Sequence, residues 1–318
     1  MRPLNRRELF MSLYRFKPVL VLWLCCFVFI PLAASAAVPA DIPRARIAVI
    51  GGTFLNDIFF YRDVVKKEFT LETTLGTSPK IYYAEWDGIP FYYVHNHGDG
   101  QWQQTWVALY DLGVEEAIGG ATAGAINPSM KVYDYIIPHD LIDMNIDRPL
   151  GFPKQVYRDP NAIPLPRLTP AMDTDLRQIL LEQTRKAIKA DKRYKSFKVH
   201  DKGVIVQARG GRFETVAEIK MFGQWGGDLV TMSVGTEIVY ARQLGINYAT
   251  VVVISNPAEG VGEWDFSLMK ELYPVINPLS LDIVLNSLKP IAALHGKPRV
   301  ADGLINHPEM TSQAQKDH

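Results

Sequence analysis

Residues 203–260 read GVIVQARGGRFETVAEIKMFGQWGGDLVTMSVGTEIVYARQLGINYATVVVISNPAEG. The pattern predicts, in order, a strand, a glycine turn, a helix, a short strand, a second helix, a buried strand and a polar loop. Several polar residues of this stretch fall where a strand meets a turn or a helix. Strand ends of this kind are where α/β sheets bind small molecules. The stretch therefore predicts an α/β protein whose ligand site lies at these strand ends.

Length and composition favour one large globular domain. The chain has 318 residues, of which 47% are apolar and 11% aromatic, so there is ample material for a packed core. Its formal charge is zero, but residues 1–36 are basic and the remainder is mildly acidic. Such a remainder argues against a nucleic-acid partner. We expect the domain to span residues 44–295, with a polar C-terminal tail at 296–318.

The N-terminus is typical of an export signal. A basic segment precedes the apolar run Pro18–Ala34, and Ala34–Ala36 offers the small residues of a cleavage site. Residues 1–36 are therefore predicted to be a signal peptide, which places the mature protein in the periplasm or outside the cell. The alternative is an uncleaved membrane anchor, because residues 19–38 are about long enough to span a bilayer. Both cysteines lie inside the apolar run, so the mature domain would contain neither a disulfide nor a cysteine nucleophile.

The first part of the domain predicts a strand and then a hairpin. Residues 46–53 form a short apolar run that ends in two glycines and Thr53, an arrangement that exposes backbone N–H groups and suits an anion. Residues 80–86 and 89–94 are rich in β-formers and flank Asp87-Gly88, which is a strong hairpin signal. The second strand of the hairpin leads into residues 95–99.

Residues 95–99, His-Asn-His-Gly-Asp, raise the possibility of a metal site. They resemble the opening of the metallo-β-lactamase motif, in which two imidazoles and a carboxylate ligate zinc after a strand. That motif continues with a further histidine, and here the position is Gly100. Without that ligand we expect no metal site, and a solvent-facing turn is the alternative.

The middle of the chain supplies further helices and strands. Residues 101–112 have helical spacing, and residues 117–126 form a strand of small residues that either packs tightly against a helix or lets a ligand ring approach. Residues 135–143 continue the sheet into a loop. A proline-rich irregular segment at 144–170 then precedes a helix at 172–190.

Within residues 203–260 we expect a strand at 204–208, a helix at 213–225 and a buried strand at 251–254. Glu214 falls in the first turn of that helix, where the helix dipole alone favours a carboxylate. Residues 255–257, Ser-Asn-Pro, are a plausible turn. Each of these features has a purely structural explanation when it is considered alone.

Their combination is more specific than the parts. Six segments follow one another along residues 46–290: Ile50–Thr53, Thr122–Ile126, Ile137–Asp143, Gly211–Ile219, Met232–Ser233 with Glu237, and Val253–Gly260. With them the chain resembles the trimeric branch of the nucleoside phosphorylase family, and within it the S-methyl-5′-thioinosine phosphorylases. The resemblance implies a mixed central sheet flanked by helices and a homotrimer.

The same resemblance implies the reaction. Such enzymes are pentosyltransferases that cleave the N-glycosidic bond of a purine nucleoside with phosphate, here a 6-oxopurine nucleoside or a 5′-methylthionucleoside. Phosphate is a co-substrate, and no cofactor is needed. The site must anchor the phosphate, stabilise an oxocarbenium-like sugar and accept negative charge on the departing base.

For the base and the sugar, the resemblance assigns six residues. Glu214 would accept the N1–H of a 6-oxopurine, and Asn256 would donate to its N7 or O6 as charge develops there. Members that act on adenine carry an aspartate in place of Asn256, so we expect hypoxanthine or guanine to be preferred over adenine. The remaining substrate contacts implied are Ala123, Gly124, Phe213 and Met232.

For the phosphate, the resemblance assigns Thr53, Thr122 and Ser233. Family members also carry an arginine after the second hairpin strand, where this chain has residues 95–97, His-Asn-His. A guanidinium binds phosphate bidentately and with permanent charge, which neutral histidine or asparagine cannot replace.

Three alternatives follow from the missing arginine. Phosphate binds through His95 or His97, or water replaces phosphate and the protein is a nucleosidase, or the protein binds nucleosides without cleaving them. In the hydrolytic case His97 is the preferred general base, with Asp99 and Glu237 as the other candidates.

Overall fold

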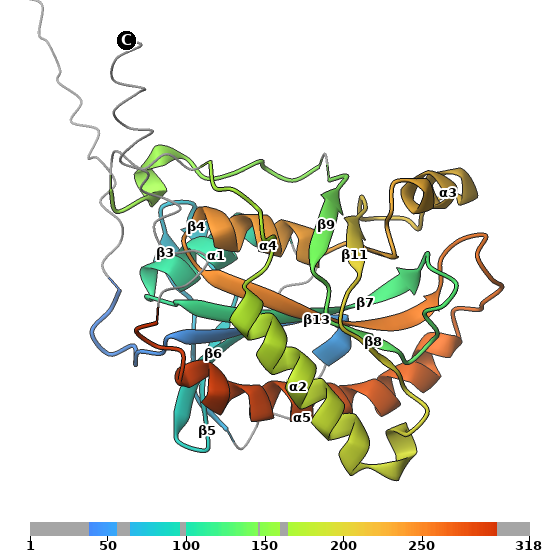
Figure 1. Cartoon of the computed structure of the whole chain (residues 1–318). Helices are drawn as coiled ribbons and strands as arrows, with labels where there is room; N and C mark the ends of the chain where they lie inside the picture. Colours follow the sequence, from blue (N-terminus) through green and yellow to red (C-terminus); the bar gives the residue numbers. More distant parts are fainter. Residues whose placement is uncertain (1–37, 56–63, 96–99, 146, 160–164, 298–318) are drawn as a thin grey trace, which may run out of the picture. The chain divides into compact units, whose positions relative to one another are not determined.

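The computed structural model describes residues 38–55, 64–95, 100–145, 147–159 and 165–297. Eleven strands within these ranges form one mixed sheet, and helices lie on both sides of its central strands (Figure 1). The predicted α/β class, with a mixed central sheet flanked by helices, is confirmed. The predicted signal peptide or anchor and nearly all of the C-terminal tail lie outside the described ranges.

Four parallel strands make up the centre of the sheet. In spatial order they are β13 (Asn247–Pro257), β7 (Glu116–Ala125), β1 (Ile47–Gly51) and β6 (Ile89–His95). Parallel pairing places the carboxyl ends of all four at one edge. The sheet continues beyond β6 through β5 (Ile81–Trp86) and β2 (Val65–Phe69), and beyond β13 through β8 (Tyr135–Ile136) and β10 (Val199–His200).

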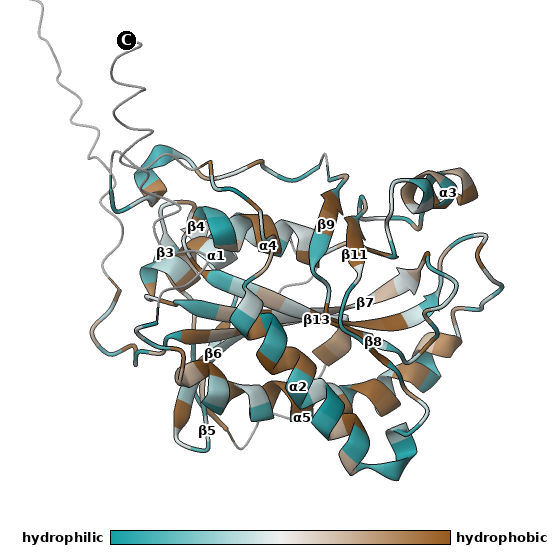
Figure 2. Ribbon diagram, in the orientation of Figure 1, coloured by the Kyte–Doolittle hydropathy of each residue, from teal (hydrophilic) through white to brown (hydrophobic). Residues whose placement is uncertain are grey.

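A branch of three strands leaves the sheet at the end of β7. β12 (Leu229–Thr231) pairs antiparallel with Gly124 and Ala125, and β11 (Val204–Gln207) and β9 (Asp140–Asp143) follow it in parallel. In Figure 2 strand β11 is largely hydrophobic, whereas β9 combines hydrophobic and hydrophilic residues. A separate two-stranded sheet joins β3 (Glu72–Thr73) and β4 (Gly76–Thr77).

The described part of the chain contains five α-helices, four of which flank the central strands. Helices α2 (Thr174–Ala190) and α5 (Leu268–Ala292) lie on one side of the central strands in Figure 1. Helices α1 (Trp102–Asp111) and α4 (Val234–Gln243) lie on the other side, and α3 (Val216–Gln224) lies beyond the branch. None of the helices in these ranges combines the length and apolarity that a membrane span requires.

Local sequence signals account for most of these boundaries. Asp87 and Gly88 both have positive φ, at 49° and 73°, and close a two-residue turn between β5 and β6, as the D-G pair predicts. The Asp173 side chain accepts hydrogen bonds from the N–H groups of Asp175 and Leu176 and so caps α2. Gly113, at φ 82°, follows α1.

Two predictions of local structure were wrong. Helix α3 begins at Val216, because Thr215 and Glu218 form a capping box, so Glu214 precedes the helix instead of occupying its first turn. The explanation of Glu214 as a first-turn carboxylate favoured by the helix dipole therefore does not apply. Asn256 and Pro257 do not form a turn, because β13 continues through them with a register irregularity after Ile254.

The small residues of β7 serve both purposes that the sequence left open. A Cβ at Gly119 would lie 2.1 Å from the Tyr248 hydroxyl, and a Cβ at Gly120 would lie 2.5 Å from the ring of Phe54. These two glycines therefore permit tight packing. Gly124, farther along the strand, lines the pocket described below.

We predict that Gly120→Ala destabilises the fold by about 1–3 kcal/mol, because an added methyl group would overlap the fully buried ring of Phe54. Urea unfolding of both proteins measures the difference. Gly210→Ala is the matched control, since a Cβ at Gly210 meets nothing within 4 Å. Equal stabilities for the Gly120 variant and the wild type would contradict the packing argument.

Candidate active site

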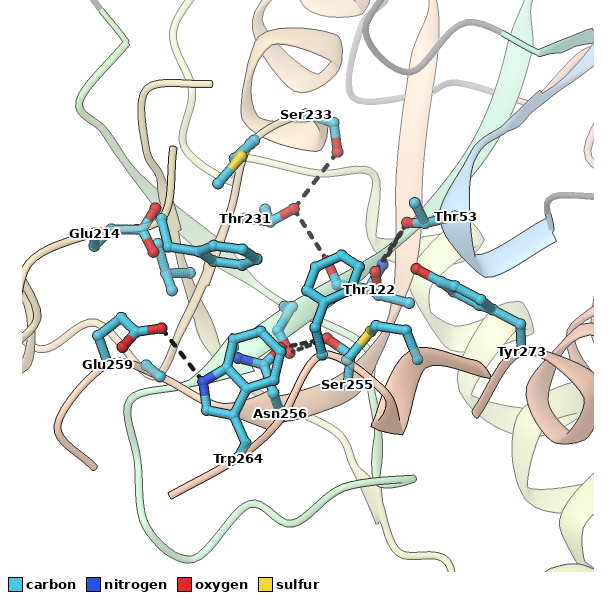
Figure 3. A pocket seen from close by; sticks show the side chains of 18 residues that line it. Thr53, Thr122, Glu214, Thr231, Ser233, Ser255, Asn256, Glu259, Trp264 and Tyr273 are labelled. Carbon is cyan, nitrogen blue, oxygen red and sulfur yellow. Dashed lines mark hydrogen bonds between the residues drawn. The ribbon is translucent and has the colours of Figure 1, made fainter. Parts of the chain in front are cut away.

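A pocket of about 250 Å³ opens at the carboxyl ends of the central strands (Figure 3). Its walls come from the ends of β7, β12 and β13, the turn after β1, the segment before α3, the segments after β12 and β13, and the start of α5. The lining residues are Thr53, Thr122, Ala123, Gly124, Phe213, Glu214, Val230, Thr231, Met232, Ser233, Ser255, Asn256, Ala258, Glu259, Trp264, Phe266, Met269 and Tyr273. The structure thus brings nine of the predicted site residues together from five separate segments.

One end of the pocket contains Glu214 and Asn256. The Ser255 hydroxyl donates to Oδ1 of Asn256 at 2.7 Å, and Nδ2 of Asn256 donates to the Pro257 carbonyl at 2.8 Å. These two hydrogen bonds fix the orientation of the amide, and Oδ1 already accepts the hydrogen bond from Ser255. An amide nitrogen carries two hydrogens, so Nδ2 can also donate to a ligand.

Glu214 is buried, and its surroundings disfavour its charged form. Burial is the main cause that raises the pKa of this carboxyl, and the neighbouring charges of Glu218 and Glu259 act in the same direction. Its own backbone N–H and Arg212 oppose the rise. A buried carboxyl with a perturbed pKa inside a pocket is typical of a functional group.

Aromatic side chains form one wall near Glu214. The ring of Phe213 lies 5.3 Å from that of Trp264 and 6.4 Å from that of Phe266, both edge to face. Phe213 and Phe266 are 45% and 66% exposed, which is unusual for such large apolar side chains. Together the three rings offer a flat ligand an apolar, partly open surface.

The other end of the pocket is rich in hydroxyl groups. The Thr53 hydroxyl accepts hydrogen bonds from the Thr122 hydroxyl at 2.9 Å and from the Thr122 backbone N–H at 3.2 Å. The Thr231 hydroxyl lies 3.5 Å from that of Ser233. Figure 3 shows the Tyr273 hydroxyl pointing toward the two threonines at this end. Burial raises the pKa of Tyr273, and a hydrogen bond with Thr122 opposes the rise.

The described lining contains no arginine, lysine or histidine. Two arginines lie close behind this lining: Arg212, whose guanidinium donates to the Phe213 carbonyl and pairs with Glu218, and Arg148, behind the turn from β12 to α4. The Arg148 guanidinium donates to the carbonyls of Met232 and Ser233, the latter at 3.3 Å, and stacks on the ring of Trp102 at 4.4 Å. Arg148 therefore fixes the turn that carries two predicted site residues without entering the pocket.

Of the two predicted histidines, only His95 belongs to the described residues, and it does not line the pocket. His95 ends β6 opposite Gly51, and its Nδ1 lies 3.2 Å from the Tyr93 hydroxyl, so its predicted phosphate contact has no geometric support here. His97 and Asp99 lie outside the described residues, as does most of the proposed metal motif. Among the described residues no cluster of potential ligands could hold a metal ion.

Glu237 is unsuited to activate water in this pocket. It lies in α4, is buried and does not belong to the lining. Its carboxylate accepts a hydrogen bond from the Tyr248 hydroxyl at 2.5 Å. Burial raises the pKa of Glu237 to about 7, against the opposing effects of Tyr248 and the charge of Arg148. The proposal that it acts as a hydrolytic base was wrong, because the folded chain separates it from the cavity.

The raised pKa of Glu237 predicts a pH-dependent stability. The unfolded carboxyl titrates near 4.5 and the folded one near 7, so between these values the folded state binds the extra proton. Stability contributed by this proton is present below pH 4.5 and is lost as pH rises through 7. Between pH 5 and pH 8 the free energy of unfolding of the wild type should fall by on the order of 2 kcal/mol more than that of the Glu237→Gln variant.

Urea unfolding of both proteins at the two pH values tests this, with Glu182→Gln as a control at an exposed carboxylate. A Glu237 variant with the same pH dependence as the wild type would contradict the assignment.

Comparison with known proteins agrees with this geometry. Residues 103–288 match the family model described as Phosphorylase superfamily. A probable 6-oxopurine nucleoside phosphorylase of Archaeoglobus fulgidus is 35% identical over 223 residues, which are 68% of this chain and 83% of that protein. The chain belongs to the phosphorylase superfamily. The predicted family membership is thereby confirmed.

Other members of the superfamily show the breadth of the match. A probable S-methyl-5′-thioinosine phosphorylase of Methanothermobacter thermautotrophicus is 27% identical over 75% of this chain and 80% of its own length. The crystal structure of a methylthioadenosine phosphorylase from an Antarctic soil metagenomic library has the same fold. It aligns with a TM-score of 0.70 and 22% identity over 83% of this chain and 91% of that one.

Membership in the superfamily did not reveal every residue of the pocket. Sequence reasoning missed Ser255, which orients Asn256. It also missed Tyr273, which lies in α5, far along the chain from the two threonines. Ser255 stood beside a predicted site residue and could have been found by asking what holds that amide. No sequence signal distinguishes Tyr273, because only the packing of α5 against the sheet brings its hydroxyl to the threonines.

Proposed function

We propose that this protein cleaves the N-glycosidic bond of 6-oxopurine nucleosides, including 5′-methylthio forms, with phosphate. The observation that carries the proposal is the division of one pocket into two ends. A carboxyl and an oriented amide, from Glu214 and Asn256, occupy one end, and a cluster of hydroxyls occupies the other. Relatives named 6-oxopurine and S-methyl-5′-thioinosine phosphorylases support the same substrate class.

On the base side, the two polar groups match a 6-oxopurine. A carboxyl oxygen of Glu214 accepts the N1–H of the base, and Nδ2 of Asn256 donates to N7 or O6. As the bond from C1′ to N9 breaks, its electron pair moves onto the purine. A donor held in advance at N7 or O6 stabilises this charge without reorganisation. The ring of Phe213 lies beside the base.

On the sugar and phosphate side, Met232 supplies an apolar surface to the ribose. A phosphate oxygen attacks C1′ as the bond to N9 breaks, so phosphate is itself the nucleophile and no separate general base is required. Thr53, Thr122 and Ser233 offer hydroxyls to the phosphate oxygens, and Ser233 stands at the N-terminus of α4, where the helix dipole favours an anion. Tyr273 adds a fourth hydroxyl.

A nucleosidase is the second candidate, and one observation favours it. The described lining offers phosphate no cationic side chain, whereas a dianion binds most strongly to a guanidinium or ammonium. Water needs no such charge. In that case His97 is the proposed base. A third possibility, a protein that binds nucleosides without cleaving them, would leave the oriented Asn256 amide without a catalytic purpose.

We predict that inosine releases hypoxanthine only when phosphate is present, and that adenosine is cleaved at least about tenfold more slowly in kcat/KM, because adenine has no N1–H for Glu214 and its 6-amino group cannot accept from Asn256. Both effects are measured by running the reactions with and without phosphate and quantifying the released base by chromatography.

The outcomes separate the three functions. Formation of ribose 1-phosphate identifies the phosphorylase, and free ribose without phosphate identifies the nucleosidase. Tight binding of inosine with no release of base identifies a binding protein. A preference for adenosine would contradict the role given to Asn256.

We further propose that the enzyme is exported and works as a homotrimer. The basic and apolar composition of residues 1–36 and the small residues at 34–36 support cleavage near Ala37. The resemblance to trimeric phosphorylases supports the oligomer. Residues 44–295 then form the catalytic domain, and residues 296–318 form a peripheral tail.

Expression of the full chain in a bacterial host tests both points. We predict that the periplasmic fraction contains a protein whose N-terminal sequence begins near Ala37 and whose mass in sedimentation equilibrium is three times that of the mature chain. Recovery of the intact chain from the membrane fraction would instead establish an anchor, and a monomeric mass would rule out the trimer.

A further inference from the structure

Glu259 is a second carboxylate at the base end of the pocket. It follows β13 and belongs to the pocket lining together with Glu214 (Figure 3). In Figure 3 both carboxylates lie at the end opposite Thr53 and Tyr273. They are close enough for the charge of Glu259 to act on the Glu214 carboxyl. The base end therefore contains two acidic groups, where recognition of a single N1–H requires one.

The Glu259 side chain is held in place. The indole Nε1–H of Trp264 donates to its Oε1 at 3.3 Å, and Trp264 is itself packed against Phe213 at 5.3 Å. In the described ranges neither Glu259 nor Glu214 forms an ion pair with a basic side chain. The two carboxylates can therefore be matched by N–H donors of a ligand.

The purine bases differ in how many such donors they present on this edge. Guanine offers N1–H and both hydrogens of its 2-amino group, whereas hypoxanthine offers N1–H alone and has only a C–H at position 2. Adenine presents an acceptor at N1. Two adjacent carboxylates are thus satisfied together by guanine, while hypoxanthine leaves one of them facing a C–H, which costs binding energy.

We infer that Glu259 is a specificity-determining residue that selects 2-amino-6-oxopurines, so that guanine nucleosides are preferred over hypoxanthine nucleosides. The inference rests on the proposed function, because it places the purine edge against Glu214. Glu259 receives the 2-amino group, and Trp264 keeps its carboxylate turned to that position.

Steady-state kinetics with guanosine and inosine test the inference. The wild type should favour guanosine in kcat/KM by about tenfold. Glu259→Gln keeps the size of the side chain but replaces one carboxylate oxygen with an NH2 group, which cannot accept a hydrogen bond from the 2-amino group. Glu259→Ala removes the acceptor altogether. Both variants should lose most of the preference, because guanosine is affected about tenfold more than inosine.

Glu263→Gln is the matched control, since Glu263 lies in the same segment, is exposed and does not line the pocket. It should leave the guanosine-to-inosine ratio unchanged. Calorimetric binding of free guanine and hypoxanthine supplies a second readout without turnover, and thermal melting shows whether each variant is folded. Guanine should lose affinity in the folded Glu259 variants while hypoxanthine changes less.

The results distinguish two kinds of failure. If neither nucleoside is cleaved by the wild type, the proposed function is wrong. If both are cleaved and the ratio is the same in the wild type and the folded Glu259 variants, the function stands and the inference about Glu259 is overturned. An unchanged ratio of guanine to hypoxanthine affinity in those variants would overturn it as well.

Discussion

The parallel pairing of β7 with β13 is the constraint on which the rest of the structure depends. The two strands run side by side from Glu116 opposite Asn247 to Ala125 opposite Pro257. Because they are parallel, the small residues at the end of β7 and the polar residues at the end of β13 arrive at the same edge. The register irregularity between Ile254 and Asn256 places the amide in the pocket. Every other wall is built around this pair of strand ends.

The pocket formed there has a strong internal polarity. Carboxyl groups and aromatic rings lie at one end, hydroxyls lie at the other, and basic side chains are missing from its described lining. Arg148 lies behind the turn at Met232 and Ser233 and donates to their carbonyls, and Arg212 donates to the Phe213 carbonyl and pairs with Glu218. Positive charge is thus used to hold the frame of the site, while neutral donors face the ligand. This arrangement makes recognition of the base more specific than recognition of the attacking group.

Much of the fold could be predicted from local patterns in the sequence. The D-G pair predicts the turn between β5 and β6, and the periodicity of residues 172–190 predicts α2 to within two residues at its start. Predictions failed where a local signal competed with a stronger contact. The start of α3 is shifted because Thr215 and Glu218 satisfy the helix N-terminus, and Asn-Pro continues a strand because β7 supplies its pairing partner.

The sequence by itself determined the class of fold, the family and the chemical identity of most of the groups around the ligand, because these reside in short segments whose residue types are specific. Tertiary structure alone decided which of those groups share a cavity. It buries Glu237 against Tyr248 and away from the pocket, and it adds Tyr273 and Glu259 to the lining. These placements depend on how helices α4 and α5 and the segment after β13 pack on the sheet. Contacts between residues so distant along the chain leave no local pattern to read.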